Sequence, residues 1–476
     1  MTSNLLVIMS DEHQARAMGC AGHPFVQTPH LDGLAARGTR FTDAYTPSPI
    51  CVPARAAFAT GQPVHVNRLW DNAMPYVGAP RGWGHALQDG AITVESIGKL
   101  HYRDAADNTG FDVQHIPMQV AGGVGMVWGS IRQEQERLAM PGRMLGKYIG
   151  AGTSPYTEYD AAVVTRTADW LEQRAATGDS SPWCLYVGLV APHFPLVVLQ
   201  EYLDLYPVDS LPEVKLHPNT GYTRHPWVEK QNAVANSEEA FHSPEERLTA
   251  MAAYYGLTTW MDHNVGRILA ALENAGFGHD TTVIYTSDHG DNVGARGLWG
   301  KSNLYQESVA VPMIMAGPGV PQGTCDTPVS LLDLSATIPA HFGQPFTCDG
   351  TPLPEIAAAP TNPDRTILSQ YHAIGAVSGA YMLRSGKWKL NHYVGFPSEL
   401  FDLEADPEEL HDLAADPAHA DTLARLELQL AGLVDPAEAN RQAFADQAAL
   451  IAHHGGREKA ITLGAPAATP PPKVTP

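Results

Sequence analysis

The sequence has 476 residues, enough for two domains or for one large α/β domain with an appendage, and 44% hydrophobic and 17% charged residues describe an ordinary globular protein. The net charge of −21 argues against a nucleic-acid partner, and five scattered cysteines form neither a disulfide framework nor a CxxC metal pattern. The first residues lack the basic start and cleavage site of a signal peptide, and no apolar run could span a bilayer, so we expect a cytoplasmic protein with no membrane partner.

The acidic balance also constrains any enzyme that acts on anions. The long-range field of the net charge of −21 would repel such a substrate, although salt screens the field beyond roughly 8 Å. The site itself must therefore be locally cationic. A substrate with a neutral or cationic far end is better tolerated than a polyanion.

The chain begins with a predicted buried strand. Residues 4–10 form a short apolar run, and Asp11 and Glu12 follow it directly. Open α/β sheets place their sites at this carboxyl edge. A carboxylate here also suits the capping of a following helix, so the position alone leaves both roles open. Next, residues 28–38 predict a short helix and residues 41–46 a strand.

A cysteine then occurs at the start of a predicted helix. Residues 54–60 form a helical run that Gly61 ends. Cys51 therefore lies at or just before a helix N-terminus, where free N–H groups favour an anion, and Arg55 lies on the same side. The arrangement suits a nucleophile that attacks an anionic group. A buried structural cysteine fits the same residues equally well.

Two candidate histidines lie in the middle of the chain. Lys99 and His101 share a face if their segment is extended, although a solvated pair is the simpler explanation in isolation. Residues 158–174 predict a core-facing amphipathic helix. The apolar strand at 183–190 leads to His193, which neighbouring prolines hold in a rigid loop. Many histidines in such places only cap a loop, so this residue also stays open.

A second acidic strand end comes later in the chain. A helix predicted to begin after Ser243 precedes a β-rich run at 281–286. That run ends at Asp288 and His289, and a glycine-rich loop with Lys301 follows. The second strand end therefore repeats the pattern of the first and adds an imidazole.

The strand predicted at 309–316 ends an alternation of strands and helices that predicts an α/β fold with a largely parallel sheet. After residue 345 the chain becomes proline-rich, and then short strands predict a small antiparallel α+β subdomain, at 366–370, 381–383 and 388–390. A helical pattern covers 423–453, and the proline-rich end is either disordered or an extended arm on a partner subunit. We therefore expect a catalytic domain, an antiparallel subdomain and a helix with a candidate oligomerisation arm: residues 1–363, 364–430 and 431–476.

The two strand ends together predict a metal group. Hard oxygen ligands with one imidazole suit calcium, magnesium or manganese. Cations and histidines around such a metal describe the transfer of a tetrahedral anionic group, because cations neutralise the oxyanion and histidines move protons. The metal candidates are Asp11, Asp288 and His289, and the groups around them are Cys51, Arg55, Lys99, His101, His193 and Lys301.

Residues 51–55 resemble the CxPxR signature of the type I sulfatases, a family of the alkaline phosphatase superfamily. The resemblance extends in order to about residue 417. It implies an α/β/α sandwich with a mostly parallel central sheet and a small C-terminal α+β subdomain. The further features are Asp11, Gly98-Lys99-Leu100-His101, Ala191-Pro192-His193-Phe194-Pro195, Ser287-Asp288-His289-Gly290, Lys301 and residues 400–407.

Within the family, residues 70–72 and 98–101 resemble the branch of choline sulfatases and phosphonate monoester hydrolases. That branch forms oligomers through C-terminal segments, so the resemblance implies a homodimer or homotetramer. It also implies that a maturation enzyme oxidises Cys51 to formylglycine. One hydroxyl of the hydrated aldehyde then attacks the sulfur of a small-molecule sulfate ester, and the other expels sulfate by hemiacetal breakdown.

The resemblance also implies a role for each candidate residue. Calcium is the first choice for the metal, with manganese or magnesium as alternatives. The implied metal ligands are residue 51, Asp11, Asp288 and His289. The residues implied to hold formylglycine are Arg55 and Lys99, with His101 as the base for its breakdown. The sulfuryl oxygens and the leaving group are assigned to His193 and Lys301, and contact with the metal or the transferred group to Asn72.

Glu12 departs from the family pattern, since many sulfatases have a second aspartate at this position. Glutamate is one methylene longer than aspartate. It therefore either reaches the metal as a ligand or lies beside the ligands.

Other functions compete with a sulfatase of aryl or alkyl esters. A phosphonate monoester hydrolase or phosphodiesterase uses the same residues, because both groups are tetrahedral monoanions. A cysteine enzyme with a free thiolate is disfavoured, because the CxPxR spacing is too short for the phosphatase loop with five residues between cysteine and arginine. A non-catalytic binding protein ranks last, because every catalytic position is filled. A choline-type substrate suits the acidic charge, but it needs an aromatic or acidic cage that sequence does not place.

Overall fold

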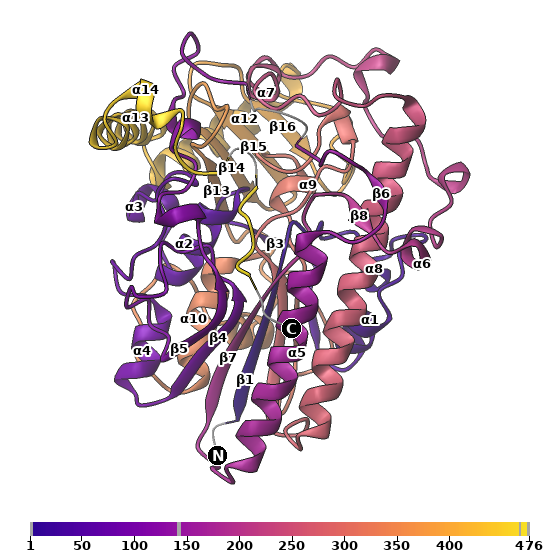
Figure 1. Ribbon diagram of the computed structural model, residues 1–476. Coiled ribbons are helices and arrows are strands. Elements are labelled where there is room, and N and C mark those ends of the chain that lie inside the picture. Colours follow the sequence, from indigo (N-terminus) through magenta and orange to yellow (C-terminus); the bar gives the residue numbers. More distant parts are fainter. Residues whose placement is uncertain (1–2, 140–143, 466–467, 474–476) are drawn as a thin grey trace.

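The computed structural model describes residues 3–139, 144–465 and 468–473, and its centre is an eight-stranded sheet (Figure 1). The strand order is β11-β2-β10-β9-β1-β7-β4-β5. Strand β10 is antiparallel to both of its neighbours, and the other pairs in this sheet are parallel. In sheet order the strands are Gly323–Cys325, Thr39–Phe41, Met313–Ala316, Thr281–Ser287, Asn4–Asp11, Trp183–Pro192, Thr93–Lys99 and Val113–Met118.

Helices cover both faces of this sheet because its central strands are apolar on both sides. In β1, Leu6 and Ile8 face one helical layer, and the alternate residues Leu5, Val7 and Met9 face the other. The first layer consists of α1 (Pro29–Ala36), α5 (Pro155–Ala176) and α8 (Pro244–Asn274), with α5 and α8 side by side in Figure 1. The second layer consists of α2 (Cys51–Thr60), α4 (Trp83–Asp89), α10 (Leu331–His341) and α11 (Leu353–Ala358). The predicted α/β/α sandwich with a mostly parallel sheet is confirmed.

The carboxyl ends of four neighbouring strands meet at one edge of the sheet. Strand β1 ends at Asp11, which lies beside Pro192 at the end of β7. Strand β9 pairs with β1 up to Ser287, so Asp288 and His289 leave the sheet next to Asp11. Strand β4 ends at Lys99 on the other side of β7. The register of the sheet therefore gathers the predicted metal and cationic residues from distant parts of the chain.

Helix α2 begins at Cys51, three residues earlier than the predicted run at 54–60. Pro53 becomes its third residue, where the N–H that proline lacks would have no intrahelical partner anyway. Gly61 ends the helix with a left-handed φ of 65°, as expected. All ten residues of α2 are buried, so the helix start is fixed inside the protein.

A four-stranded antiparallel sheet follows the α/β/α layers in the chain, in the order β13-β14-β15-β16. Its strands are Ile367–Tyr371, Ala380–Ser385, Trp388–Tyr393 and Glu399–Asp402. The helical region predicted at 423–453 is two helices, α12 (Ala420–Leu433) and α13 (Pro436–His453). The break arises because Pro436 cannot continue a helix and Asp435 caps the next one through two backbone N–H groups.

Two predicted strands are shorter than expected. The strand predicted at 309–316 is shortened to β10, which begins only at Met313, because a short helix, α9 (Gln306–Val309), extends into the start of the predicted range. The strand predicted at 41–46 is divided between β2 and β3 (Ala44–Tyr45), which pairs with β12 (Val329–Ser330). Another small pair joins β6 (Gly150–Ala151) to β8 (Val197–Val198). Within the described ranges, the helices are too short or too polar to cross a membrane.

Candidate active site

A cavity of about 70 Å³ lies at the carboxyl edge of the sheet. Short helices and loops of residues 122–154 contribute Met126 and Met144 to its lining, and residues 140–143 lie outside the described ranges. Polar, apolar and aromatic side chains share its lining. The predicted site residues that line it are Cys51, Asn72, Lys99, His101, His193 and Lys301.

Cys51 lies at the bottom of the site and meets the predicted metal group. Its Sγ is 3.2 Å from Nε2 of His289 and 3.6 Å from Oδ1 of Asp11. Burial, and then the charge of Asp11, raises the pKa of the thiol to about 11. The thiol is therefore protonated at neutral pH despite its position at a helix N-terminus, which argues against a free-thiolate enzyme.

Four side chains could hold a metal ion together. One ligand atom from each lies within 4.8 Å of the others, and all four residues are buried. Nδ1 of His289 is 3.1 Å from the carbonyl oxygen of Gly290, so an Nδ1–H that donates there leaves Nε2 for a metal. Two carboxylates and one imidazole fit a hard divalent cation. The group comprises Asp11, Cys51, Asp288 and His289.

Two buried cations hold these carboxylates. Arg55 donates from Nε to Oδ2 of Asp288 at 2.8 Å and from Nη2 to Oδ2 of Asp11 at 3.2 Å. Its Nη1 donates to the carbonyl oxygen of Lys99, whose Nζ forms an ion pair with Asp11. Although burial alone would raise it, Lys99 and the other nearby cations hold the pKa of Asp11 well below its ordinary value. Asp11 is therefore ionised and ready to bind a cation.

Glu12 lies next to that metal group and contacts a lysine. Its Oε2 accepts a hydrogen bond from Nζ of Lys301 at 2.9 Å, and its backbone has a φ of 72°. Its Oε1 is buried with no hydrogen-bond partner among the described residues, and burial raises the pKa of the carboxyl well above its ordinary value. It belongs instead to a separate potential ligand group with Asp11 and His193.

His193 and Lys301 form a coupled pair. Nζ of Lys301 donates to Nε2 of His193 at 2.7 Å, and Nδ1 of His193 is 2.6 Å from the carbonyl oxygen of Phe194. Burial, and then the charge of Lys301, lowers the pKa of His193 well below its ordinary value. Although burial alone would lower it, neighbours led by Cys51 hold the pKa of Lys301 well above its ordinary value. The proton of the pair therefore resides on Lys301.

His101 contacts the C-terminal tail, which the sequence did not predict. Its Nε2 is 2.7 Å from Oγ1 of Thr469, and its Nδ1 is buried with no partner in the described chain. Tyr156 donates its hydroxyl to the carbonyl oxygen of Thr469 at 2.7 Å. Burial, and then Lys99, lowers the pKa of His101 well below its ordinary value, so the ring is neutral. Figure 1 shows the tail running down toward the carboxyl edge of the sheet.

Asn72 is held at the start of α2. Its Oδ1 accepts a hydrogen bond from the backbone N–H of Val52 at 3.2 Å. The preceding Asp71 is buried and accepts hydrogen bonds at 2.7 Å from Ser130 and from Gln447 of α13. A C-terminal helix therefore positions a loop at the opposite end of the sequence.

Three aromatic rings of the cavity were not singled out from the sequence. Tyr156 lies in the first turn of α5, just before the predicted helix at 158–174. Phe194 and Trp299 lie in the loops that carry His193 and Lys301. The sequence offered a signal for Phe194 and Trp299, because each lies within two positions of a candidate residue. It offered no such signal for Tyr156 or Thr469.

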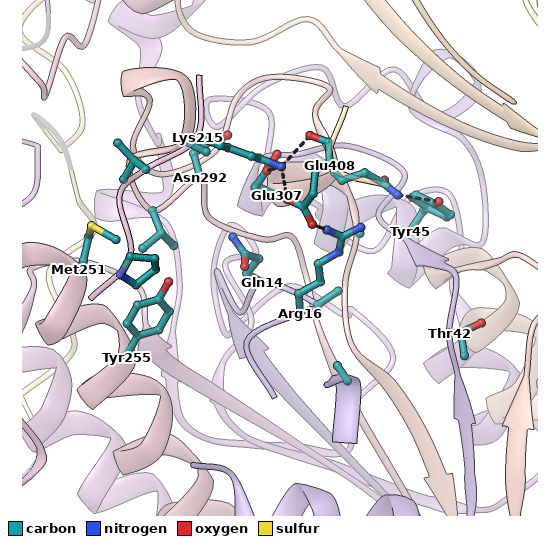
Figure 2. Close-up of a pocket in the computed structure, with 18 of the residues that line it drawn as sticks. Gln14, Arg16, Thr42, Tyr45, Lys215, Met251, Tyr255, Asn292, Glu307 and Glu408 are labelled. Atoms are coloured by element: carbon teal, nitrogen blue, oxygen red, sulfur yellow. Dashed lines mark hydrogen bonds and ion pairs between the residues drawn. The ribbon is translucent and has the colours of Figure 1, made fainter. Parts of the chain in front are cut away.

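A larger cavity of about 370 Å³ lies elsewhere and contains none of the predicted site residues. Figure 2 shows Lys215 paired with Glu307 and Glu408, and Arg16 paired with Glu408. These mutually neutralised ion pairs leave little net charge to recognise an anion. We therefore assign the active site to the smaller cavity, which contains the cysteine, the cations and the metal group.

Comparisons with known proteins agree with this geometry. A family model described as Sulfatase matches residues 3–344, and another described as N-sulphoglucosamine sulphohydrolase, C-terminal matches residues 294–435. The chain is 32% identical over 421 residues to a choline-sulfatase of Rhizobium meliloti (strain 1021), covering 85% of this chain and 81% of that protein. It is 28% identical to arylsulfatase K of Danio rerio, covering 85% and 78%. The solved phosphonate monoester hydrolase of Agrobacterium radiobacter superposes with a TM-score of 0.72 at 21% identity, covering 90% and 95%.

Proposed function

Because the chain belongs to the sulfatase family, as a type I sulfatase of the alkaline phosphatase superfamily and hence a sulfuric-ester hydrolase, we propose that it uses a formylglycine made from Cys51 and a divalent metal ion. One observation carries the proposal. The Sγ atom of Cys51 belongs to the same buried group of ligand atoms as Asp11, Asp288 and His289. A modified side chain at residue 51 would therefore meet the metal directly.

The residues present fit such a metal. Asp11 is ionised, and His289 presents Nε2 to the same point. We propose Asp11, Asp288, His289 and residue 51 as ligands, with calcium as the first choice and manganese or magnesium as alternatives. When bound, the ion would neutralise negative charge on the transferred group. Glu12 is proposed as the acceptor for Lys301 rather than as a ligand.

Formylglycine would supply a hydroxyl nucleophile in its hydrated form, which a protonated and buried thiol does not offer. The pKa of Cys51, raised to about 11, supports this role as a precursor. We expect an aldehyde-reactive hydroxylamine probe to label the peptide that contains Cys51 after expression with a maturation enzyme. The Cys51→Ala variant is the matched control. If mass spectrometry finds no labelled peptide in an active preparation, the formylglycine proposal fails while the hydrolase assignment stands.

The other site residues have separate proposed roles in the reaction. Arg55 and Lys99 fix the carboxylates and surround residue 51 with positive charge. Lys301 carries the proton of its pair with His193, so we propose that it donates a hydrogen bond to the sulfuryl group and protonates the departing alcohol oxygen. His101 is neutral, and its Nδ1 has no hydrogen-bond partner among the described residues, so it can accept the proton whose removal from residue 51 releases sulfate.

We propose a small sulfate ester with a quaternary ammonium leaving group as the substrate. The cavity is small, and the rings of Tyr156, Phe194 and Trp299 contribute to its lining. Aromatic faces attract such cations, and the relative in Rhizobium meliloti is named choline-sulfatase. The acidic net charge would repel an anionic ester but not choline sulfate, a zwitterion whose two charges cancel. No carboxylate lines the cavity in the described chain, so the rings rather than an acidic cage would recognise the ammonium group.

The substrate proposal is tested with a pair of isosteres. Choline sulfate and 3,3-dimethylbutyl sulfate have nearly the same shape, and only the former carries a positive charge, on its ammonium group. We expect kcat/KM to be about tenfold higher for choline sulfate, since a desolvated cation–π contact is worth ~1 to 2 kcal/mol. Equal values would reject the choline-type substrate. A phenyl phosphonate monoester turned over faster than the matching aryl sulfate would instead favour the phosphonate monoester hydrolase.

We also keep three expectations about organisation within this proposal. A maturation enzyme would be the partner that modifies Cys51. The division at residues 363 and 430 and a homodimer or homotetramer remain predictions. In the described chain, Thr469 of the tail contacts its own active site. A tail that lay on a partner subunit would therefore lose this contact with its own active site.

A further inference from the structure

A second cluster of potential metal ligands lies between α1 and α8. One ligand atom each from His30, Asp262 and His263 lies within 4.8 Å of the others. These residues line neither of the two cavities described above. The cluster belongs to the helical layer over the sheet and has no part in the proposed reaction.

Asp262 anchors the cluster from inside the protein. It is fully buried, and its two oxygens accept hydrogen bonds from the backbone N–H groups of His30 at 3.1 Å and Leu31 at 2.8 Å. It therefore caps the first turn of α1 from a different helix. Among the described residues no lysine or arginine forms an ion pair with Asp262, and the basic side chains grouped with it are the two histidines. A buried carboxylate of this kind favours a bound cation.

His263 is oriented for the same point. Its Nδ1 is 2.9 Å from the hydroxyl of Tyr202. When Nδ1–H donates to that oxygen, the lone pair of Nε2 is left for a metal, which is how proteins usually orient ligating histidines. The ring of Tyr202 packs against the imidazole with centroids 5.3 Å apart, which fixes its plane.

His30 lies on the backbone of α8 because residue 266 is glycine. A Cβ at Gly266 would lie 2.5 Å from three atoms of the His30 ring. The ring is 5.8 Å from that of His263 and is exposed, and its nitrogens have no hydrogen-bond partner in the described chain. A glycine inside a helix costs stability, so the space that it leaves for this ring is a specific feature.

We propose that His30, Asp262 and His263 form a second metal site, for a borderline divalent ion such as Zn²⁺, that ties α1 to α8. Two imidazoles and one carboxylate are a three-residue donor set for zinc, with the fourth position left to water. The proposed catalytic group differs, because its two carboxylates and one imidazole suit a harder ion. The two sites would therefore be filled by different metals.

The test uses the full chain with excess Ca²⁺ to fill the catalytic group, followed by titration with Co²⁺ as a spectroscopic substitute for Zn²⁺. We expect the wild type to bind one Co²⁺ with the visible absorption of a four-coordinate site, and Zn²⁺ to displace it. His30→Ala should bind Co²⁺ at least tenfold more weakly. Gly266→Ala should do the same while retaining every ligand, because its methyl group displaces the ring of His30.

Two further measurements make the outcome decisive. His453→Ala is the matched control, because His453 and His454 are neighbouring imidazoles that belong to no potential ligand group in the described chain. Circular dichroism should show both test variants folded, and Gly266→Ala covers the case in which His30→Ala does not fold. Equal Co²⁺ affinity in the wild type, His30→Ala and Gly266→Ala would overturn the proposal, as would the absence of the visible band in the wild type.

Discussion

At the scale of single residues, the position of one proton distinguishes the roles of His193 and Lys301. The pKa of His193 is lowered and that of Lys301 is raised, so a single proton resides on the lysine over the working range. In the proposed reaction the lysine is therefore the acid, and the histidine accepts its hydrogen bond. Glu12 accepts a hydrogen bond from the same Nζ of Lys301.

We predict that Lys301→Ala lowers kcat/KM by about 10² to 10³, because it removes a preorganised donor to developing negative charge. The loss should be larger for an alkyl sulfate than for 4-nitrophenyl sulfate, since an alkoxide needs the proton and a nitrophenolate does not. Steady-state kinetics with both esters measures this difference. Lys230→Ala, which removes an exposed pair with Glu134, is the control. Equal losses for both esters would contradict the acid role.

Asp160 gives a second prediction at this scale, through stability. Its carboxylate accepts hydrogen bonds at 2.8 Å from the backbone of Val190 and Ala191, at the end of β7 before His193. Burial raises its pKa to about 7 from an ordinary 3.8. The folded state therefore binds this proton more tightly than the unfolded state does. Its contribution to stability is fully present below about pH 4 and is lost as the pH rises to about 7.

The magnitude is on the order of 4 kcal/mol, because each pKa unit corresponds to ~1.4 kcal/mol. Many other carboxylates titrate in the same interval, so the informative quantity is a difference between two proteins. Between pH 4 and 7, the thermal midpoint of the wild type should fall relative to that of Asp160→Asn, which cannot titrate. Parallel pH profiles of the two midpoints would show that Asp160 is not protonated in the folded state.

At the scale of elements, the strand ends were predictable and the helix boundaries were less so. The apolar runs before Asp11 and Asp288 have the length and composition of buried strands, and parallel strands bring their carboxyl ends to one edge. Cys51 was expected at or just before the start of a helix, and α2 confirms this. The predicted helical run began three residues later, at residue 54, because a proline at the third helical position is as well tolerated as one at the first. Local residue patterns do not separate these two cases.

The contact between α13 and residues 70–72 could not be predicted from the sequence. Asp446 accepts hydrogen bonds from Trp70 and Arg68, and Gln447 donates to Asp71 at 2.7 Å. Nothing in a helical pattern rich in alanine indicates which polar residues face a partner almost four hundred positions away. Only the packing of the two segments decides that Gln447 is buried.

We predict that Gln447→Leu lowers kcat/KM about 5- to 30-fold. The buried Asp71 would lose one donor, at a cost of ~1 to 2 kcal/mol, and the adjoining Asn72 would lose its fixed position at α2. Asn72→Ala in the same background should then have a smaller effect than it has in the wild type, which a double-mutant cycle measures. Gln442→Leu is the control, because Gln442 lies on the same helix and, in the described chain, its side chain bonds only to Glu438. Additive effects would show that α13 does not act through Asn72.

At the scale of the whole molecule, the site collects positive charge inside a protein with a net charge of −21. The cations Arg55, Lys99 and Lys301 are all buried or nearly so, and each contacts a carboxylate. Their field is therefore local, and the acidic exterior dominates at a distance. Such a molecule selects against polyanionic substrates before they reach the cavity, which agrees with a small monosulfate ester.

The C-terminal tail is the whole-molecule feature that bears most directly on selectivity. Thr469 links the tail to His101 of one loop and to Tyr156 of α5, and Trp128 donates to the carbonyl oxygen of Ala465 at 3.1 Å. Ala468 and Thr469 form part of the cavity lining. Segments from the beginning, middle and end of the chain therefore close the same small space.

We predict that removal of residues 464–476 raises KM for a small alkyl sulfate about tenfold and raises kcat/KM for the bulkier 4-methylumbelliferyl sulfate, because the cavity loses one wall. Thr469→Val keeps that wall and removes only the hydroxyl at His101, so it should lower kcat by about fivefold without changing the preference between the two esters. Thr462→Val is the matched control, because among the described residues its hydroxyl bonds only to the carbonyl oxygen of Lys459. If the shortened protein keeps the wild-type preference between the two esters, the tail has no part in selecting the substrate. A loss confined to kcat in both variants would assign it to the positioning of His101 alone.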